Sequence, residues 1–134
     1  MTTASTSLSA PATGSVRTLL RLEGLALLVG ALLLYARVGG GWLIFAELFL
    51  LPDVSFVGYV FGPRIGAIAY NTAHSTLGPI LFAAIAVASG TGLPFALIWL
   101  AHVGFDRALG YGLKYASGFR DTHLGRIGRR SEET

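Results

Sequence analysis

The fold is decided by residues 66–111, which read GAIAYNTAHSTLGPILFAAIAVASGTGLPFALIWLAHVGFDRALGY. Two apolar runs in this stretch, 66–89 and 93–111, are separated only by a Gly-Thr-Gly turn. Each run is long enough to cross the hydrocarbon core of a bilayer, which takes roughly 17–25 residues. Each run also contains one histidine, His74 in the first and His102 in the second. We therefore predict two membrane helices joined by a tight turn, each carrying ionisable side chains.

The composition of the whole chain is typical of a membrane protein. Of its 134 residues, 53% are hydrophobic and only 13% are charged, and the mean hydropathy is +0.64. Soluble domains carry roughly 25% charged residues. The chain contains no cysteine, which excludes disulfides and thiolate metal ligands. Its basic residues do not form a dense stripe with interleaved aromatic residues, so we expect the partner to be the lipid bilayer and not a nucleic acid.

Two further apolar segments precede the deciding stretch, at 19–35 and 42–61. Pro52 and Asp53 interrupt the second one, and proline breaks the hydrogen-bond ladder of a helix. We therefore expect a bent or re-entrant connection between Pro52 and Arg64. The predicted fold is all-α, an integral membrane bundle of four transmembrane helices with the second helix interrupted near Pro52. The predicted organisation comprises a disordered leader (1–16), the membrane domain (17–115) and a basic cytoplasmic tail (116–134).

Lys and Arg residues near helix ends indicate the orientation in the membrane, because they concentrate in short cytoplasmic loops. Nine of the ten basic residues fall on one side if both termini are cytoplasmic: Arg17, Arg21, Arg64, Arg107, Lys114, Arg120, Arg126, Arg129 and Arg130. Only Arg37 falls on the opposite side. We predict cytoplasmic N- and C-termini. Arg107, Lys114 and Arg120 are also placed to bind anionic lipid or another anionic head group.

Polar side chains recur at helical spacing within the apolar runs. His102 and Asp106 are four residues apart and share one helix face, and Tyr70, Asn71 and His74 form a second stripe. An ionisable group in hydrocarbon is costly and persists mainly where it faces a bundle interior. We expect the two stripes to pack together as a polar centre. Three further residues are expected to join it or lie at its edge: Glu47, Asp53 and His123. Trp99 and Tyr111 are expected at the membrane interface, with no further role.

Three interpretations of this polar centre stay open. The first is a metal or catalytic centre formed by Asp53, His74, His102 and Asp106, because imidazole and carboxylate ligands suit zinc, manganese or iron. No His-Glu-x-x-His motif or i,i+4 histidine pair is present. The second is a hydrogen-bonded network that holds the helices together. The third is the proton or ligand path of a transporter, which at 134 residues would require a homo-oligomer.

Two longer runs carry a family resemblance. The runs 51–74, which reads LPDVSFVGYVFGPRIGAIAYNTAH, and 99–125, which reads WLAHVGFDRALGYGLKYASGFRDTHLG, resemble small bacterial multi-pass membrane proteins of the DUF4260 type. The resemblance covers residues 18–127 and implies an integral protein of the bacterial inner membrane, but no reaction. Pro52-Asp53 and His74-Ser75 are also similar to pairs in inner-membrane proteins described as metal-dependent hydrolases. This chain departs from that pattern, because it lacks the His-Arg pair that precedes the His-Ser pair there.

Overall fold

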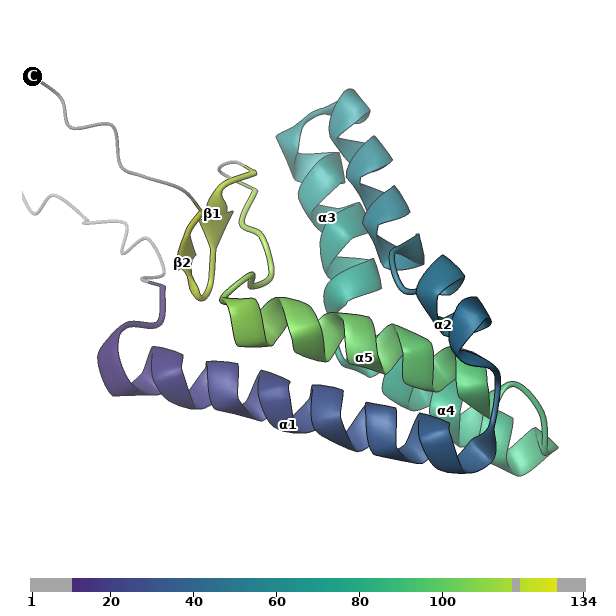
Figure 1. Ribbon diagram of the computed structural model, residues 1–134. Coiled ribbons are helices and arrows are strands. Elements are labelled where there is room, and N and C mark those ends of the chain that lie inside the picture. Colours follow the sequence, from purple (N-terminus) through teal and green to yellow (C-terminus); the bar gives the residue numbers. More distant parts are fainter. Residues whose placement is uncertain (1–10, 117–118, 128–134) are drawn as a thin grey trace, which may run out of the picture.

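The structure is a computed structural model, and it describes residues 11–116 and 119–127. Helices dominate this part of the chain (Figure 1). In chain order they are α1 (Gly14–Val38), α2 (Trp42–Leu48), the 3₁₀ helix η1 (Leu51–Phe61), α3 (Pro63–His74), α4 (Leu77–Ser89) and α5 (Leu93–Leu109). A small antiparallel hairpin follows, with strands β1 (Asp121–Thr122) and β2 (Gly125–Arg126). The prediction of an all-α fold is confirmed.

Helices α1 and α5 lie side by side and antiparallel, and they form the base of the molecule (Figure 1). Two glycines allow their close approach. A Cβ atom at Gly104 would lie 2.7 Å from the backbone oxygen of Gly24 and 2.7 Å from the backbone nitrogen of Leu28. Small residues at such crossings let two helix backbones approach closely, which is how membrane helices gain packing energy. This contact fixes α5, the helix that carries His102 and Asp106.

The helix η1 packs along α3, and this pair stands away from the layer formed by α1 and α5 (Figure 1). Helix α4 packs instead against α5. The interruption near Pro52 is confirmed, since α2 ends at Leu48 and η1 begins at Leu51 with the proline in its first turn. The connection expected between Pro52 and Arg64 is therefore an ordered 3₁₀ helix followed by the first turn of α3.

The prediction of one helix over residues 66–89 is wrong. The stretch is divided into α3 and α4 at Ser75, whose backbone is extended (φ −77°, ψ 153°), and the two helices are bent by 40°. Pro79 explains the break, because a proline ring collides with the carbonyl four residues earlier, here that of Ser75. The break places His74 at the end of a helix and exposes that helix's last carbonyl groups.

By length and composition, two helical stretches qualify to cross a membrane, α1 and Trp42–Phe61, and the bent pair α3–α4 raises the number to three. Helix α5, with 17 residues, is shorter than those stretches. The described residues therefore give two or three candidate spans where the sequence predicted four. Helix α1 already begins at Gly14, within the predicted leader, and the predicted tail contains the β1–β2 hairpin. Residues 1–10, 117–118 and 128–134, with Arg129 and Arg130, lie outside the described part.

Candidate metal centre

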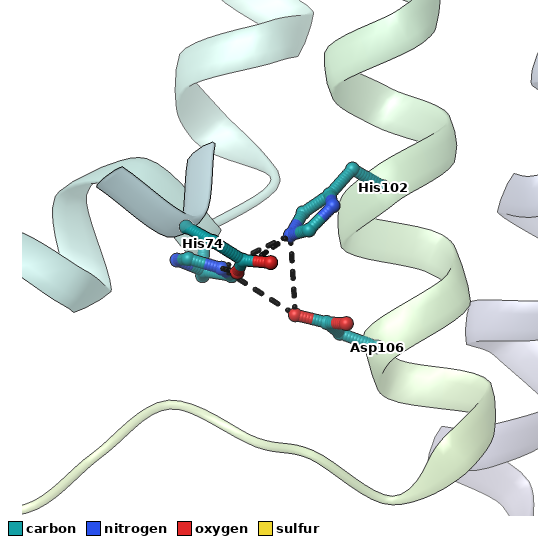
Figure 2. A group of neighbouring side chains, drawn as sticks. His74, His102 and Asp106 are labelled. Carbon is teal, nitrogen blue, oxygen red and sulfur yellow. Dashed lines mark hydrogen bonds and ion pairs between the residues drawn. The ribbon is translucent and has the colours of Figure 1, made fainter. Parts of the chain in front are cut away.

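Four side chains from three separate elements converge on one point. Asp53 comes from η1. His74 is the last residue of α3, and His102 and Asp106 lie one turn apart on α5 (Figure 2). The Nε2 atom of His74 lies 3.1 Å from Asp53 Oδ1, 3.4 Å from Asp106 Oδ2 and 3.1 Å from His102 Nε2. The Nε2 atom of His102 lies 3.3 Å from each of the same two carboxylate oxygens. The structure thus brings together the four predicted metal-ligating residues.

These distances match the ligand spacing around a tetrahedral metal ion. Zinc bonds to imidazole nitrogen and carboxylate oxygen are about 2.0–2.1 Å long. In a regular tetrahedron the ligand atoms are then separated by 1.63 bond lengths, or about 3.3–3.4 Å. The five separations that involve a histidine nitrogen run from 3.1 to 3.4 Å, and all four ligand atoms lie within 4.8 Å of one another. The centre therefore has the size that a first-row divalent ion requires.

The protonation of His74 is set by its other ring nitrogen. Nδ1 lies 2.9 Å from the backbone oxygen of Tyr70, an acceptor, so Nδ1 carries the proton and donates. In the neutral imidazole this leaves the Nε2 lone pair directed at the two carboxylates and at His102. Metal-bound histidines show this arrangement, with one nitrogen on the ion and the other donating to a carbonyl or carboxylate. The Tyr70 ring adds support by stacking on the His74 ring at 3.8 Å, with 10° between the planes.

His102 is enclosed by α5 and by the end of α2. Its ring meets the ring of Phe49 edge to face at 5.3 Å. Its Nδ1 is buried and makes no hydrogen bond within the described part of the chain. Only 1% of the side chain is exposed, so the imidazole is shielded from bulk water.

The two imidazoles are sealed, whereas the two carboxylates face a pocket. The exposed fraction of the side chain is 3% for His74 and 1% for His102, but 35% for Asp53 and 16% for Asp106. The carboxylates line a pocket of about 300 Å³ (hereafter the polar pocket), with Phe56, Tyr70, Tyr111, Lys114, Phe119 and Ile127. A molecule that enters this pocket reaches the centre from its carboxylate side.

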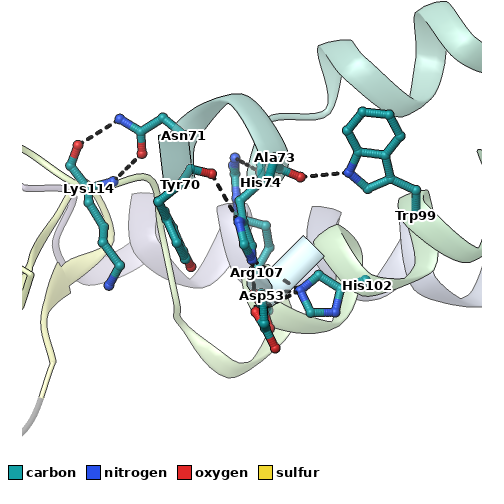
Figure 3. A network of polar contacts seen from close by, with 10 residues as sticks. Asp53, Tyr70, Asn71, Ala73, His74, Trp99, His102, Arg107 and Lys114 are labelled. Atoms are coloured by element: carbon teal, nitrogen blue, oxygen red, sulfur yellow. Dashed lines mark hydrogen bonds and ion pairs between the residues drawn. The ribbon is translucent and has the colours of Figure 1, made fainter. Parts of the chain in front are cut away.

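The carbonyl groups freed at the end of α3 receive side-chain donors from α5 (Figure 3). The indole N–H of Trp99 donates to the Ala73 oxygen at 2.6 Å, and the Arg107 guanidinium donates to the His74 oxygen at 3.3 Å. A broken helix at membrane depth requires such partners, because hydrocarbon offers none. Trp99 thus has a positioning role that the sequence did not predict. The available signal was its spacing, one turn before His102 on α5.

Lys114 and Asn71 join the loop after α5 to α3. The Asn71 side chain accepts from the Lys114 backbone N–H at 2.6 Å and donates to the Lys114 carbonyl at 2.8 Å. The Lys114 ammonium donates to the Phe119 oxygen at 2.7 Å and lies 3.7 Å from the centroid of the Phe119 ring and 4.6 Å from that of Tyr70. Burial lowers the pKa of Lys114 to about 8. Asn71, expected in the polar centre, instead fixes this loop.

Three other predicted residues lie apart from the centre. Glu47 is exposed on α2, and Arg120 is exposed just before β1. His123 lies in the turn of the hairpin, where its Nδ1 accepts a hydrogen bond from the Leu113 N–H at 2.8 Å. Burial and the nearby charge of Arg107 lower the pKa of His123. His123 therefore holds the C-terminal hairpin against the loop after α5.

Comparisons with known proteins identify the family and nothing more specific. No curated protein and no solved structure matches the chain. One family model matches residues 17–127 and is described as a domain of unknown function, DUF4260. This range includes every residue of the candidate metal centre and of the polar pocket. The chain belongs to the DUF4260 family.

Proposed function

We propose that this protein binds one divalent transition-metal ion through Asp53, His74, His102 and Asp106, and that it uses this centre as a membrane-embedded hydrolase. The observation that carries the proposal is the set of five separations of 3.1–3.4 Å between ligand atoms of three different elements. Two nitrogen and two oxygen ligands at this spacing favour zinc, with manganese and iron as alternatives. Such an ion polarises carbonyl or phosphoryl oxygens and acidifies water.

The difference between the two carboxylates favours a catalytic over a purely structural centre. Structural zinc sites are closed by four protein ligands, whereas catalytic sites keep one position for water or substrate. Asp53 has the more exposed side chain, 35% against 16% for Asp106. It belongs to a 3₁₀ helix that shows no buried residue. We assign His74, His102 and Asp106 as the permanent ligands. Asp53 is the group that would give up its coordination position to water or substrate, and it would accept a proton from the attacking water.

We further propose that the protein lies in the bacterial cytoplasmic membrane and has both termini on the cytoplasmic side. In this proposal it crosses the membrane four times, with the 17-residue helix α5 as a span in addition to α1, Trp42–Phe61 and the pair α3–α4. The antiparallel arrangement of α1 and α5 supports this orientation, because the start of α1 and the end of α5 lie at the same end of the molecule (Figure 1). Arg17 and Arg21 contact the carbonyls of Leu124 and Ala108 there. Basic residues concentrated at one end are typical of the cytoplasmic side.

The metal content of the purified protein tests this proposal. The protein is washed with chelator, supplied in turn with zinc, manganese and iron, and analysed by elemental mass spectrometry. We expect one ion per chain in the wild type and less than a tenth of that in His74→Ala and His102→Ala. His123→Ala is the matched control, because this histidine lies outside the centre, and it is expected to keep the ion. A metal-free wild type after all three supplements would overturn the metal centre.

A second comparison separates the roles of the carboxylates. We expect Asp106→Asn to lose the ion. Asp53→Asn is expected to keep it and to lose hydrolysis of a chromogenic ester or phosphoester by at least a hundredfold, the scale of one general base. Glu47→Gln, an exposed carboxylate on α2, is the control for both measurements. Equal loss of metal in Asp53→Asn and Asp106→Asn would instead indicate a closed, structural ion.

A further inference from the structure

We propose that the substrate of this centre is an anionic amphiphile of the membrane, with its aliphatic chain in an apolar pocket on one side of the centre and its anionic head group beside Lys114 on the other. The inference deepens the proposed hydrolase function and rests on it, since the bond to be cleaved would lie between the two pockets. The inference is supported by two pockets, by the Lys114 cation and by the order of these features along α5.

The apolar pocket has a volume of about 270 Å³ and is lined by apolar and aromatic side chains of α2, η1, α3, α4 and α5. Its lining includes the residues next to two of the ligands, Pro52 beside Asp53 and Ala73 beside His74. From α5 it receives Phe95, Ile98 and Trp99, one turn before His102. Helices α2 and α4 complete it with Leu48 and Phe82, together with Leu51 of η1. This pocket fits an aliphatic chain and offers no partner to a charged group.

The order along α5 sets the orientation of the ligand. The apolar pocket meets α5 at 95–99, the ligands follow at 102 and 106, and the polar pocket meets the chain at 106, 111 and 114. Ile98 and Asp106 are eight residues apart, or about 12 Å along a helix. Along α5 the centre therefore lies between the apolar pocket and the pocket that carries the two carboxylates and Lys114, within the length of one lipid-like molecule. A membrane amphiphile has this polarity along its own axis.

Lys114 gives the polar pocket its preference for anions. The two carboxylates of this pocket belong to the metal centre, and a bound divalent ion balances their two negative charges. Among the described residues that line the pocket, Lys114 then supplies the remaining charge, which is positive. Its residue is 3% exposed, and its ammonium, which has three N–H donors, has one described acceptor, the Phe119 oxygen. A phosphate or carboxylate head group is the partner that such a buried cation favours.

Quenching of Trp99 fluorescence by brominated lipids tests this inference. Trp42→Phe leaves Trp99, which lines the apolar pocket, as the single tryptophan. The zinc-supplied protein in a neutral detergent is titrated with phosphatidic acid that carries dibrominated chains, and separately with phosphatidylcholine that carries the same chains. We expect saturable quenching by phosphatidic acid, with at least tenfold tighter apparent binding than by phosphatidylcholine.

Variants then test whether Lys114 causes the preference for phosphatidic acid and whether the apolar pocket holds its aliphatic chains. Lys114→Gln is expected to reduce binding of phosphatidic acid to the level of phosphatidylcholine, and Lys114→Arg, which keeps the charge, is expected to retain the preference. Arg120→Gln is the matched control, because it removes an exposed cation near the same loop. Leu51→Phe narrows the apolar pocket and is expected to weaken binding of long-chain phosphatidic acid while binding of dihexanoyl phosphatidic acid is unchanged.

The outcomes separate this inference from the metal proposal. An ion bound at one per chain together with equal quenching by the two lipids would overturn the substrate class and leave the metal centre intact. A metal-free protein with a Lys114-dependent preference for phosphatidic acid would overturn the metal centre alone. Equal losses in Lys114→Gln and Arg120→Gln would show attraction at the surface, against the inference. Displacement of the lipid by millimolar inorganic phosphate would identify a soluble phosphate compound as the ligand, also against it.

Discussion

Substitution of Gly104 by alanine should separate the two helices that form the base of the molecule. The new Cβ would lie 2.7 Å from backbone atoms of Gly24 and Leu28. Ordinary contact begins at 3.4 Å, so α1 and α5 must move apart by about 0.7 Å. Backbone atoms of a helix cannot rotate away as a side chain can. A gap of 0.5–1 Å forfeits roughly a quarter to a half of each contact energy along the interface.

The magnitude follows from two opposing effects. Overpacking of a well-packed interior costs about 1–3 kcal/mol, and replacement of glycine by alanine within a helix returns about 0.5–1 kcal/mol. Because both obstructing groups at Gly104 are backbone, we take the upper part of the first range and expect a net loss of about 2 kcal/mol. Gly30→Ala is the matched control in α1, since nothing lies within 4 Å of its new Cβ. It should gain about 0.5–1 kcal/mol.

Unfolding in detergent, followed by circular dichroism at 222 nm, measures the difference between the two variants. We expect Gly104→Ala to be less stable than Gly30→Ala by about 2.5–3 kcal/mol. Metal content should be determined on the same samples, because α5 carries two of the four ligands. Equal stability of the two variants would refute the close packing of α1 on α5.

Three further predictions concern the groups around the centre. Burial lowers the pKa of Lys114 from 10.5 to about 8, so between these two pH values the unfolded chain binds more protons than the folded one. The free energy of unfolding should therefore rise as the pH increases from about 8 to about 10.5. Unfolding curves recorded over this pH range should show no such rise for Lys114→Met. Burial and the charge of Arg107 lower the pKa of His123 below 6.5, so its protonation opposes folding. The protection factors of the β1 and β2 amides, which correct for the pH dependence of intrinsic exchange, should fall as the pH falls below about 6.5. An equal fall in a His123→Gln protein would contradict this assignment. Trp99→Phe leaves the Ala73 carbonyl without its donor and should cost about 1–3 kcal/mol in the same unfolding assay, whereas no loss would mean that another group replaces the indole.

The candidate site could be narrowed from the sequence but not assembled from it. Histidines and carboxylates inside apolar runs identify the ionisable groups that need a protected place, because the cost of burial applies wherever the helix packs. That argument selected Asp53, His74, His102 and Asp106, but it selected Glu47 on the same grounds. In the structure Glu47 is exposed on α2, whereas the other four converge. The cost of burying an ionisable group implies that the group needs polar partners, but it does not identify those partners.

The break between α3 and α4 shows the same limit at the level of the backbone. Hydropathy averages over a window and therefore joined residues 66–89 into one helix. Pro79 carried the opposing signal, since its ring excludes a helical Ser75. The consequences of the break are tertiary, because the carbonyls that it frees are satisfied by Trp99 and Arg107 from α5.

The sequence by itself determined that the chain is helical and apolar, where its second helix is interrupted and which ionisable residues lie within or beside its apolar stretches. These properties follow from local composition and spacing. Only the tertiary structure decided that Asp53, His74, His102 and Asp106 meet at 3.1–3.4 Å, because residues separated by 21 and 28 positions are brought together by packing between elements. It also decided that their carboxylates face a pocket beside Lys114, since that direction depends on how η1, α3 and α5 cross.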